Sequence, residues 1–209
     1  LISTADQLRA IGNSMHYDKN FMLVADIDLD PNIPGNEIII DRPFVESFHG
    51  TSDGNVYNIS LESFHGTLDG NGYIISNMVI ESYYNGRGGN RENLGLIGSL
   101  SREGIVKNIK LQNIKILGVG HNVGALVGSN RGLVSQCSVA GSISGESFIG
   151  GLVGSNYGDI VSCSAYCKVQ LVPGGPVGDA GGLVGYNHSG CIYSCYATGT
   201  VTGDESVGG

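Results

Sequence analysis

The chain has 209 residues, enough for one domain or solenoid with a buried core. Only 14% of the residues are charged, and 35 are glycine against 5 proline, which favours many tight backbone bends over a flexible linker or collagen. A net charge of −8 argues against a nucleic-acid partner, and no apolar run reaches the ~18–20 residues that would span a bilayer. The chain starts at Leu1 without a signal-peptide pattern, and residues 207–209 open a repeat that is not completed, so we expect the natural protein to continue.

Residues 1–12 carry the pattern of a short amphipathic helix. Ser3 or Thr4 is placed to cap its start, and Ala5, Leu8 and Ile11 fall on one helical face. Such a helix would cover the open end of a sheet structure, where exposed strand edges otherwise invite aggregation.

Residues Phe21 to Leu29 alternate between apolar and more polar side chains, which predicts one strand with a partly polar outer face. That face carries Asp26 and Asp28, with Asp30 just beyond it. Together with Asn32 or backbone carbonyls, these carboxylates offer oxygen ligands for calcium, although the glycine and closing glutamate of an EF-hand loop are missing. Calcium is therefore the one cofactor that the sequence suggests, and a solvated acidic face is the alternative.

Two near-duplicate segments follow, at 48–55 and 64–71, and both contain Phe-His-Gly-Thr-x-Asp-Gly-Asn. Asp-Gly-Asn is typical of a tight turn between extended segments. The Gly- and Asn-rich residues 83–92 then predict an exposed loop. We accordingly divide the chain into an N-terminal cap with irregular first coils, residues 1–93, and regular repeat coils, residues 94–209, which continue the same solenoid.

Four repeats of 26–31 residues dominate the second part, each opening on a unit similar to Gly-Gly-Leu-Val-Gly and followed in three copies by an asparagine and a further glycine. Counted from the last glycine, position +2 is always β-branched, and positions +5 and +7 are small or apolar. The odd step between +2 and +5 predicts a bend. Two columns are expected inside the structure, and they comprise Leu96, Leu126, Leu152 and Leu183, and Ile109, Cys137, Cys163 and Cys195.

A unit of this kind cannot bury its inward side chains or pair its strand edges alone. Coils stacked ~4.8 Å apart achieve both. The sequence therefore predicts an all-β protein, a right-handed parallel β-helix (β-solenoid) with a short N-terminal capping helix, since parallel crossovers are almost always right-handed. The column of Asn130, Asn156 and Asn187 suits a turn, because asparagine tolerates left-handed geometry and can bond its own backbone.

The pattern GGLVG-x-N-x-G-x-I-x-x-C, followed by G-x-V-x-G at 141–145 and 199–203, resembles the GLUG motif over residues 94–209. The first copy departs from it, with Ile109 in place of cysteine. The resemblance implies a bacterial surface protein, since the motif occurs in large adhesins and in segments of IgA-specific metallopeptidases. No H-E-x-x-H is present, so this segment lacks the zinc-peptidase motif.

The cysteine spacings of 26 and 32 residues are solenoid spacings rather than metal-ligand spacings. We interpret Cys137, Cys163 and Cys195 as buried small hydrophobes. Cys167 and Cys191 lie off that column, and the sequence leaves open whether either forms a disulfide.

These features predict an extracellular or cell-surface scaffold or adhesin module without catalytic residues, which spaces or presents a surface and stacks end to end into a fibre. Its partners would be a glycan or a host or cell-surface protein. The candidate contact residues are outward tyrosines, which offer a large area and a hydroxyl. They are Tyr157, Tyr166, Tyr186, Tyr193 and Tyr196.

The alternative is a polysaccharide lyase or hydrolase. Such an enzyme needs carboxylates and a cation on one face. In this chain that face would lie in the N-terminal third, around Asp26, Asp28, Asp41, Arg42 and Glu46.

Overall fold

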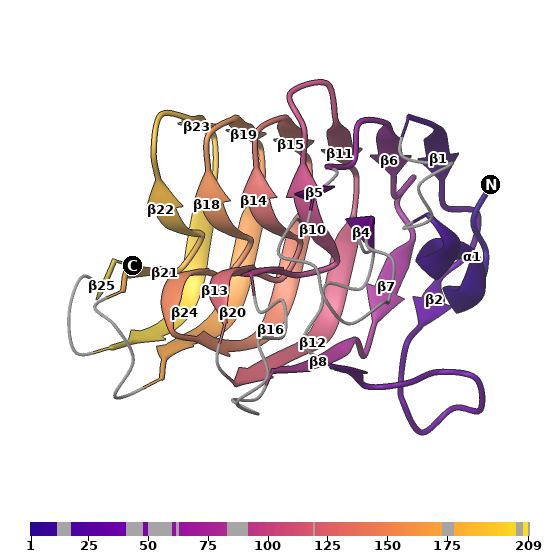
Figure 1. Cartoon of the computed structure of the whole chain (residues 1–209), viewed down its shortest axis with the longest axis horizontal. Coiled ribbons are helices and arrows are strands. Elements are labelled where there is room, and N and C mark those ends of the chain that lie inside the picture. Colours follow the sequence, from indigo (N-terminus) through magenta and orange to yellow (C-terminus); the bar gives the residue numbers. More distant parts are fainter. Residues whose placement is uncertain are drawn as a thin grey trace.

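The computed structural model describes residues 1–11, 18–40, 48–49, 60–61, 63–82, 92–118, 120–172, 178–203 and 207–208. It is a parallel β-solenoid with one short N-terminal helix, as predicted from the repeat (Figure 1). The chain passes through four strands per regular coil, and equivalent strands of successive coils pair in four parallel sheets. We name these sheets A to D in the order in which a coil visits them.

The sheets follow the repeat closely. Sheet A contains β9 (Glu92–Leu94), β13 (His121–Gly124), β17 (Ser147–Gly150), β21 (Ala180–Gly181) and β25 (Val207–Gly208). Sheet B contains β10 (Ile97–Leu100), β14 (Val127–Asn130), β18 (Val153–Asn156) and β22 (Val184–Asn187). Sheet C contains β1 (Asn20–Met22), β6 (Thr67–Asp69), β11 (Ile105–Lys107), β15 (Leu133–Ser135), β19 (Asp159–Val161) and β23 (Cys191–Tyr193).

Sheet D is the longest. It contains β2 (Ile27–Asp28), β3 (Ile39–Ile40), β7 (Ile74–Ser76), β8 (Val79–Ser82), β12 (Lys110–Gly118), β16 (Ser138–Gly145), β20 (Ser164–Leu171) and β24 (Tyr196–Thr202). A separate antiparallel pair is formed by β4 (Phe48–His49) and β5 (Ser60–Leu61). Strands β6 and β7 pair with β11 and β12, so the sheets run on from the N-terminal part into the repeats.

The register within the sheets matches the alignment of the repeats. Val106 pairs with Val134, and the same column continues through Ile160 to Ile192. The bend expected between positions +2 and +5 is also present. It is made at +4 by residues with left-handed backbone, namely Asn108, Gln136, Ser162 and Ser194, at φ 53–55°.

The expected core columns lie inside the coils. Leu96, Leu126 and Leu152 are fully buried, and Leu183 packs against the core in the last complete coil. Ile109, Cys137 and Cys163 are buried, and Cys195 is partly buried. The backbone N–H of Cys137 donates to Sγ of Cys163 at 3.4 Å, and that of Cys163 donates to Sγ of Cys195 at 3.3 Å. The thiols therefore form a continuous stack that supports the turn between sheets C and D.

The N-terminal helix α1 (Ala5–Ala10) lies at the indigo end of the solenoid (Figure 1). The Thr4 hydroxyl caps it by accepting from the N–H of Gln7 at 3.2 Å. Leu8 and Ile11 are buried and Ala5 packs against the core, so the predicted apolar face closes the first coil.

The prediction of one strand over Phe21 to Leu29 is wrong. The segment turns a corner and contributes β1 to sheet C and β2 to sheet D. At the corner the Asp26 carboxylate accepts from the N–H of Ile74 in the next coil at 2.8 Å. Burial still alternates through the corner, because Leu23, Ile27 and Leu29 all point inward. Alternation alone therefore could not reveal the break.

The asparagine column forms a hydrogen-bonded ladder, buried at Asn130 and Asn156 and exposed at Asn187, rather than left-handed turns. The Nδ2 amide of Asn130 donates to Oδ1 of Asn156 at 2.7 Å, and that of Asn156 donates to Oδ1 of Asn187 at 2.8 Å. None of the three has a positive φ, so that part of the prediction is wrong. The expected bonding to the local backbone is present, since Oδ1 of Asn130 accepts from the N–H of Gly132 at 3.1 Å.

Candidate binding groove between sheets A and B

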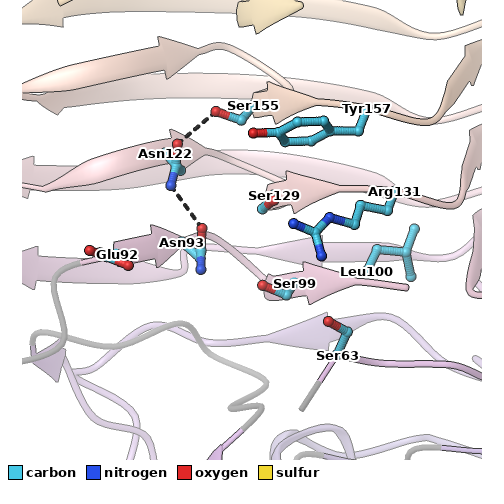
Figure 2. A pocket seen from close by; sticks show the side chains of 10 residues that line it. All are labelled: Ser63, Glu92, Asn93, Ser99, Leu100, Asn122, Ser129, Arg131, Ser155 and Tyr157. Atoms are coloured by element: carbon cyan, nitrogen blue, oxygen red, sulfur yellow. Dashed lines mark hydrogen bonds between the residues drawn. The ribbon is translucent and has the colours of Figure 1, made fainter. Parts of the chain in front are cut away.

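A cavity of about 240 Å³ lies where sheets A and B meet (Figure 2). Ten residues from coils that are consecutive along the solenoid axis line it, and nine of them are polar or carry a hydroxyl. The ten are Ser63, Glu92, Asn93, Ser99, Leu100, Asn122, Ser129, Arg131, Ser155 and Tyr157. The site is a short polar groove that runs across the coils.

The glycine unit of the repeat creates this corner. In sheet A, Asn93 and Asn122 have φ of 58° and 51°. In sheet B, the last glycine of the unit packs on their backbone, and a Cβ at Gly128 or Gly154 would lie 2.4 Å from backbone atoms of Asn93 or Asn122. Only a residue without a side chain allows this approach. The close contact holds sheets A and B at a concave angle and brings their outward side chains together.

A chain of hydrogen bonds crosses the groove (Figure 2). The hydroxyl of Ser155 donates to Oδ1 of Asn122 at 2.6 Å, and Nδ2 of Asn122 donates to Oδ1 of Asn93 at 3.0 Å. The chain ends on the Nδ2 amide of Asn93, which has no acceptor among the described residues although Asn93 is only 7% exposed. Each bond of such a chain polarises the next, which strengthens the terminal donor.

Further donors face the same space. The Ser99 hydroxyl has no hydrogen-bond partner in the described part of the chain, although Ser99 is only 8% exposed. The Ser129 and Tyr157 hydroxyls and the Arg131 guanidinium also lack a hydrogen-bond partner there. Tyr157 and Arg131 are exposed, whereas Ser99 and Asn93 are largely buried, and polar groups of largely buried residues usually have partners. The unpaired groups of Ser99 and Asn93 therefore indicate a place for a polar ligand or for ordered water.

An aromatic cluster adjoins the groove at Tyr157. The Tyr157 ring stacks on His188 with centroids 4.0 Å apart and planes at 11°, and Cζ of Arg131 lies 5.3 Å from its centroid. Tyr186 meets His188 edge-on at 4.2 Å and packs against Phe148 at 5.0 Å. The Tyr157 ring is held by these neighbours, and its hydroxyl points into the groove (Figure 2).

The five predicted contact tyrosines are all exposed, but they do not form one surface. Tyr157 and Tyr186 share the cluster beside the groove. Tyr166 and Tyr196 contact each other through their hydroxyls on sheet D, with ring centroids 5.7 Å apart. Tyr193 is 70% exposed on sheet C, apart from both pairs.

The sequence analysis did not identify the residues that line the groove. One signal was present, because Ser99, Ser129 and Ser155 each follow the last glycine of a repeat unit. The Asn93–Asn122 column was hidden by its change to Phe148 in the next coil. Arg131 and His188 belong to the same column as Tyr157, two residues beyond the serines or their tyrosine counterpart.

Asp26, Asp28 and Asp30 bind separate partners rather than converging. Oδ1 of Asp28 accepts from the amide of Asn77 at 2.8 Å and from the N–H of Asp30 at 2.9 Å, and these bonds lower the pKa of the Asp28 carboxyl. Oδ1 of Asp30 accepts from the Asn32 backbone. No group of three or more His, Cys, Asp or Glu side chains able to hold a metal occurs among the described residues. A calcium ion here stays a prediction.

The N-terminal catalytic face also gains no support. Asp41, Arg42 and Glu46 lie outside the described residues, as do the first Phe-His-Gly-Thr copy beyond its opening Phe48–His49 and nearly all of the 83–92 loop. In the second copy, the predicted turn forms at Gly70–Gly72, where the carbonyl of Gly70 accepts from the N–H of Tyr73 at 2.9 Å.

All five cysteines are free thiols. Cys167 lies on sheet D and Cys191 on sheet C, so the two do not meet. Burial raises the pKa of the Cys167 thiol to about 11, and it also raises that of Cys137. These buried thiols are therefore protonated at neutral pH, whereas Cys191 is exposed.

A comparison with protein families identifies the sequence motif in the last complete coil. The model of the GLUG motif matches residues 178–202, which form β21 to β24 of the last complete coil. The chain contains a GLUG motif. The two preceding coils carry a similar glycine unit, the asparagine and the cysteine in register with it, so the resemblance seen in the sequence is confirmed. Each GLUG coil places its glycine unit at the A–B corner and its cysteine at the C–D turn.

Two relatives extend the likeness to most of the chain. A protein described as a Gly-rich membrane protein from Evansella cellulosilytica is 35% identical over 145 residues, which are 66% of this chain and 14% of the relative. Halomucin from Haloquadratum walsbyi is 32% identical over 158 residues, which are 71% of this chain and 2% of halomucin. The chain thus matches small parts of much longer proteins. No solved structure matches the chain. The single described helix has six residues, and no helix in the described ranges has the length and apolarity to cross a membrane.

Proposed function

We propose that this chain is an extracellular, cell-surface scaffold module of the adhesin type, which spaces and presents a binding surface. The observation that carries the proposal is that the inward and outward side chains of the coils follow different patterns. Inward columns of Leu, Val, Ile and Cys repeat from coil to coil, whereas outward columns change, as from Asn93 and Asn122 to Phe148. Such an architecture holds a varied surface on a uniform rod.

The relatives support this assignment. One is described as a membrane protein and the other is halomucin, and both contain long additional sequence. A GLUG solenoid within a much larger chain is suited to spacing, because each added coil lengthens the rod by one strand separation, ~4.8 Å. Stacking of copies end to end into a fibre remains a prediction of the sequence, to be tested by light scattering against concentration.

A polysaccharide-cleaving enzyme is less well supported. Cleavage needs paired carboxylates, or a metal with a base, around one substrate bond. Among the described residues that line the groove, the only acidic one is Glu92 and the only basic one is Arg131. The N-terminal aspartates are engaged individually by backbone and amide groups. These contacts favour a non-enzymatic role.

The test is where the native protein resides. Intact cells of the producing organism are labelled with an antibody raised against this chain, and a second sample is first treated with an external protease. We expect labelling of unbroken cells or of shed material, with loss of label after protease. Label that appears only after the cells are broken would refute the proposal.

A further inference from the structure

We infer that the groove between sheets A and B binds an uncharged glycan, with one sugar residue in the cavity and the chain continuing along the solenoid axis. This inference rests on the proposed surface role, but it concerns a site that neither the GLUG motif nor the relatives assign. Three features of the groove support a glycan ligand: its unpaired hydrogen-bonding groups, its size and charge, and the adjoining aromatic cluster.

The free groups of the groove match sugar hydroxyls. Ser99, Ser129 and Tyr157 present hydroxyls that both donate and accept, and Asn93 presents an amide donor. A sugar hydroxyl also donates and accepts, so each can satisfy a protein group in either direction. Ser99 and Asn93 are more than nine-tenths buried and have no protein partner for these atoms in the described coils. A ligand that brings its own hydroxyls replaces bound water without leaving these groups unpaired.

Charge and size narrow the ligand class further. Glu92 and Arg131 give the described lining one negative and one positive side chain, a balance that favours neither an anion nor a cation. The volume of about 240 Å³ corresponds to roughly eight waters at ~30 Å³ each, which is enough for one sugar ring. Leu100 is fully buried, so the cavity offers little apolar surface to a hydrophobic side chain.

The neighbouring coils supply a second contact along the axis. Next to Tyr157, the Phe148 and Tyr186 rings lie 5.0 Å apart, and Tyr186 is 38% exposed. Aromatic rings give the apolar face of a sugar a rigid surface at low entropic cost. The groove thus pairs a polar subsite in the first three coils with an aromatic subsite at Phe148 and Tyr186.

The experiment is an NMR titration of the folded chain with neutral tetrasaccharides of glucose, mannose and N-acetylglucosamine, and with tetragalacturonate as a charged comparison. We expect at least one neutral probe to shift the side-chain amide signals of Asn93 and Asn122 and the backbone signals of Ser99 and Ser129. Tyr157→Phe removes only the hydroxyl and retains the ring stack. It should weaken binding about three- to tenfold, as expected for one net hydrogen bond.

Tyr193→Phe is the matched control, because Tyr193 lies on another sheet and should leave the affinity unchanged. No shift at the groove with any neutral probe, or equal affinity of the Tyr157→Phe variant, would overturn the inference. Tighter binding of tetragalacturonate than of every neutral probe would overturn it as well. Because cell labelling tests the surface role separately, an empty groove on a surface-exposed protein refutes the glycan inference alone.

Discussion

The buried asparagine ladder should be a major source of stability, and Asn156 is its critical member. Its side chain is fully buried and makes three hydrogen bonds, to Asn130, Asn187 and the carbonyl of Gly158, at 2.7, 2.8 and 3.1 Å. Asn156→Ala leaves the buried Asn130 amide without its acceptor, at about 1–3 kcal/mol, and removes further bonds worth about 0.5–1.5 kcal/mol net. We expect a loss of about 3 kcal/mol in the free energy of unfolding.

The matched control is Asn187→Ala, because Asn187 is exposed at the end of the ladder and water can replace its bonds. It should cost about 1 kcal/mol. Unfolding in urea gives the global difference, and amide hydrogen exchange of the β14 and β18 residues gives the local one, since coils in a solenoid can open separately. Equal losses of unfolding free energy in the two variants would refute the view that the ladder stabilises the fold mainly where its asparagines are buried.

Asn156→Asp tests the same reasoning through pH. The carboxylate keeps the shape but faces Oδ1 of Asn187 and the carbonyl of Gly158, which accepted hydrogen bonds from Asn156. Burial and these oxygens raise the folded pKa above the unfolded value of ~3.9. The variant should therefore be least destabilised below about pH 4 and lose stability as pH rises. A penalty relative to the native chain that does not change between acid and neutral pH would contradict this.

Three further results are expected. Gly154→Ala places a methyl group 2.4 Å from the backbone of the adjoining strand and should cost several kcal/mol in urea unfolding, whereas Gly208→Ala meets nothing within 4 Å and should cost little. A thiol-reactive dye should label Cys191 quickly and Cys167 only on unfolding, because burial raises the pKa of Cys167 to about 11; equal labelling rates would contradict this. The pKa of Asp28 is lowered, so Asp28→Asn should destabilise the chain at pH 7, and the difference should vanish in acid scans as pH falls through that pKa.

The solenoid itself could be predicted because its core repeats in the sequence. The Leu96 to Leu183 column keeps leucine and the +2 column keeps a β-branched residue at the same place in every repeat, and stacking of like residues is what the fold requires. The bend at +4 could be placed from the break in alternation, although its residues differ. The corner between β1 and β2 could not, because side chains continue to alternate through it.

The groove was not predictable for a related reason. Its residues lie on outward columns, where nothing in the stacking constrains their identity, and they meet only because sheets A and B are held at an angle. That angle comes from a glycine packed on a residue with positive φ, a pairing between different coils that the spacing within one repeat does not display.

The same geometry explains how the outward side chains can change while the corner between sheets A and B is kept. Gly154 packs on the backbone of Asn122 and Gly185 on that of Phe148, so closely that a Cβ at either glycine would lie 2.4 Å from that backbone. The corner is therefore set by backbone contact and not by the outward side chain. Phe148 occupies the asparagine position at φ 53°, where a bulky residue is unfavourable, and it gains contacts with Tyr186 and His188 in return. A phenylalanine in this unfavourable backbone conformation is better explained by the contacts that its ring makes outside the coils than by a contribution to the stacking of the coils.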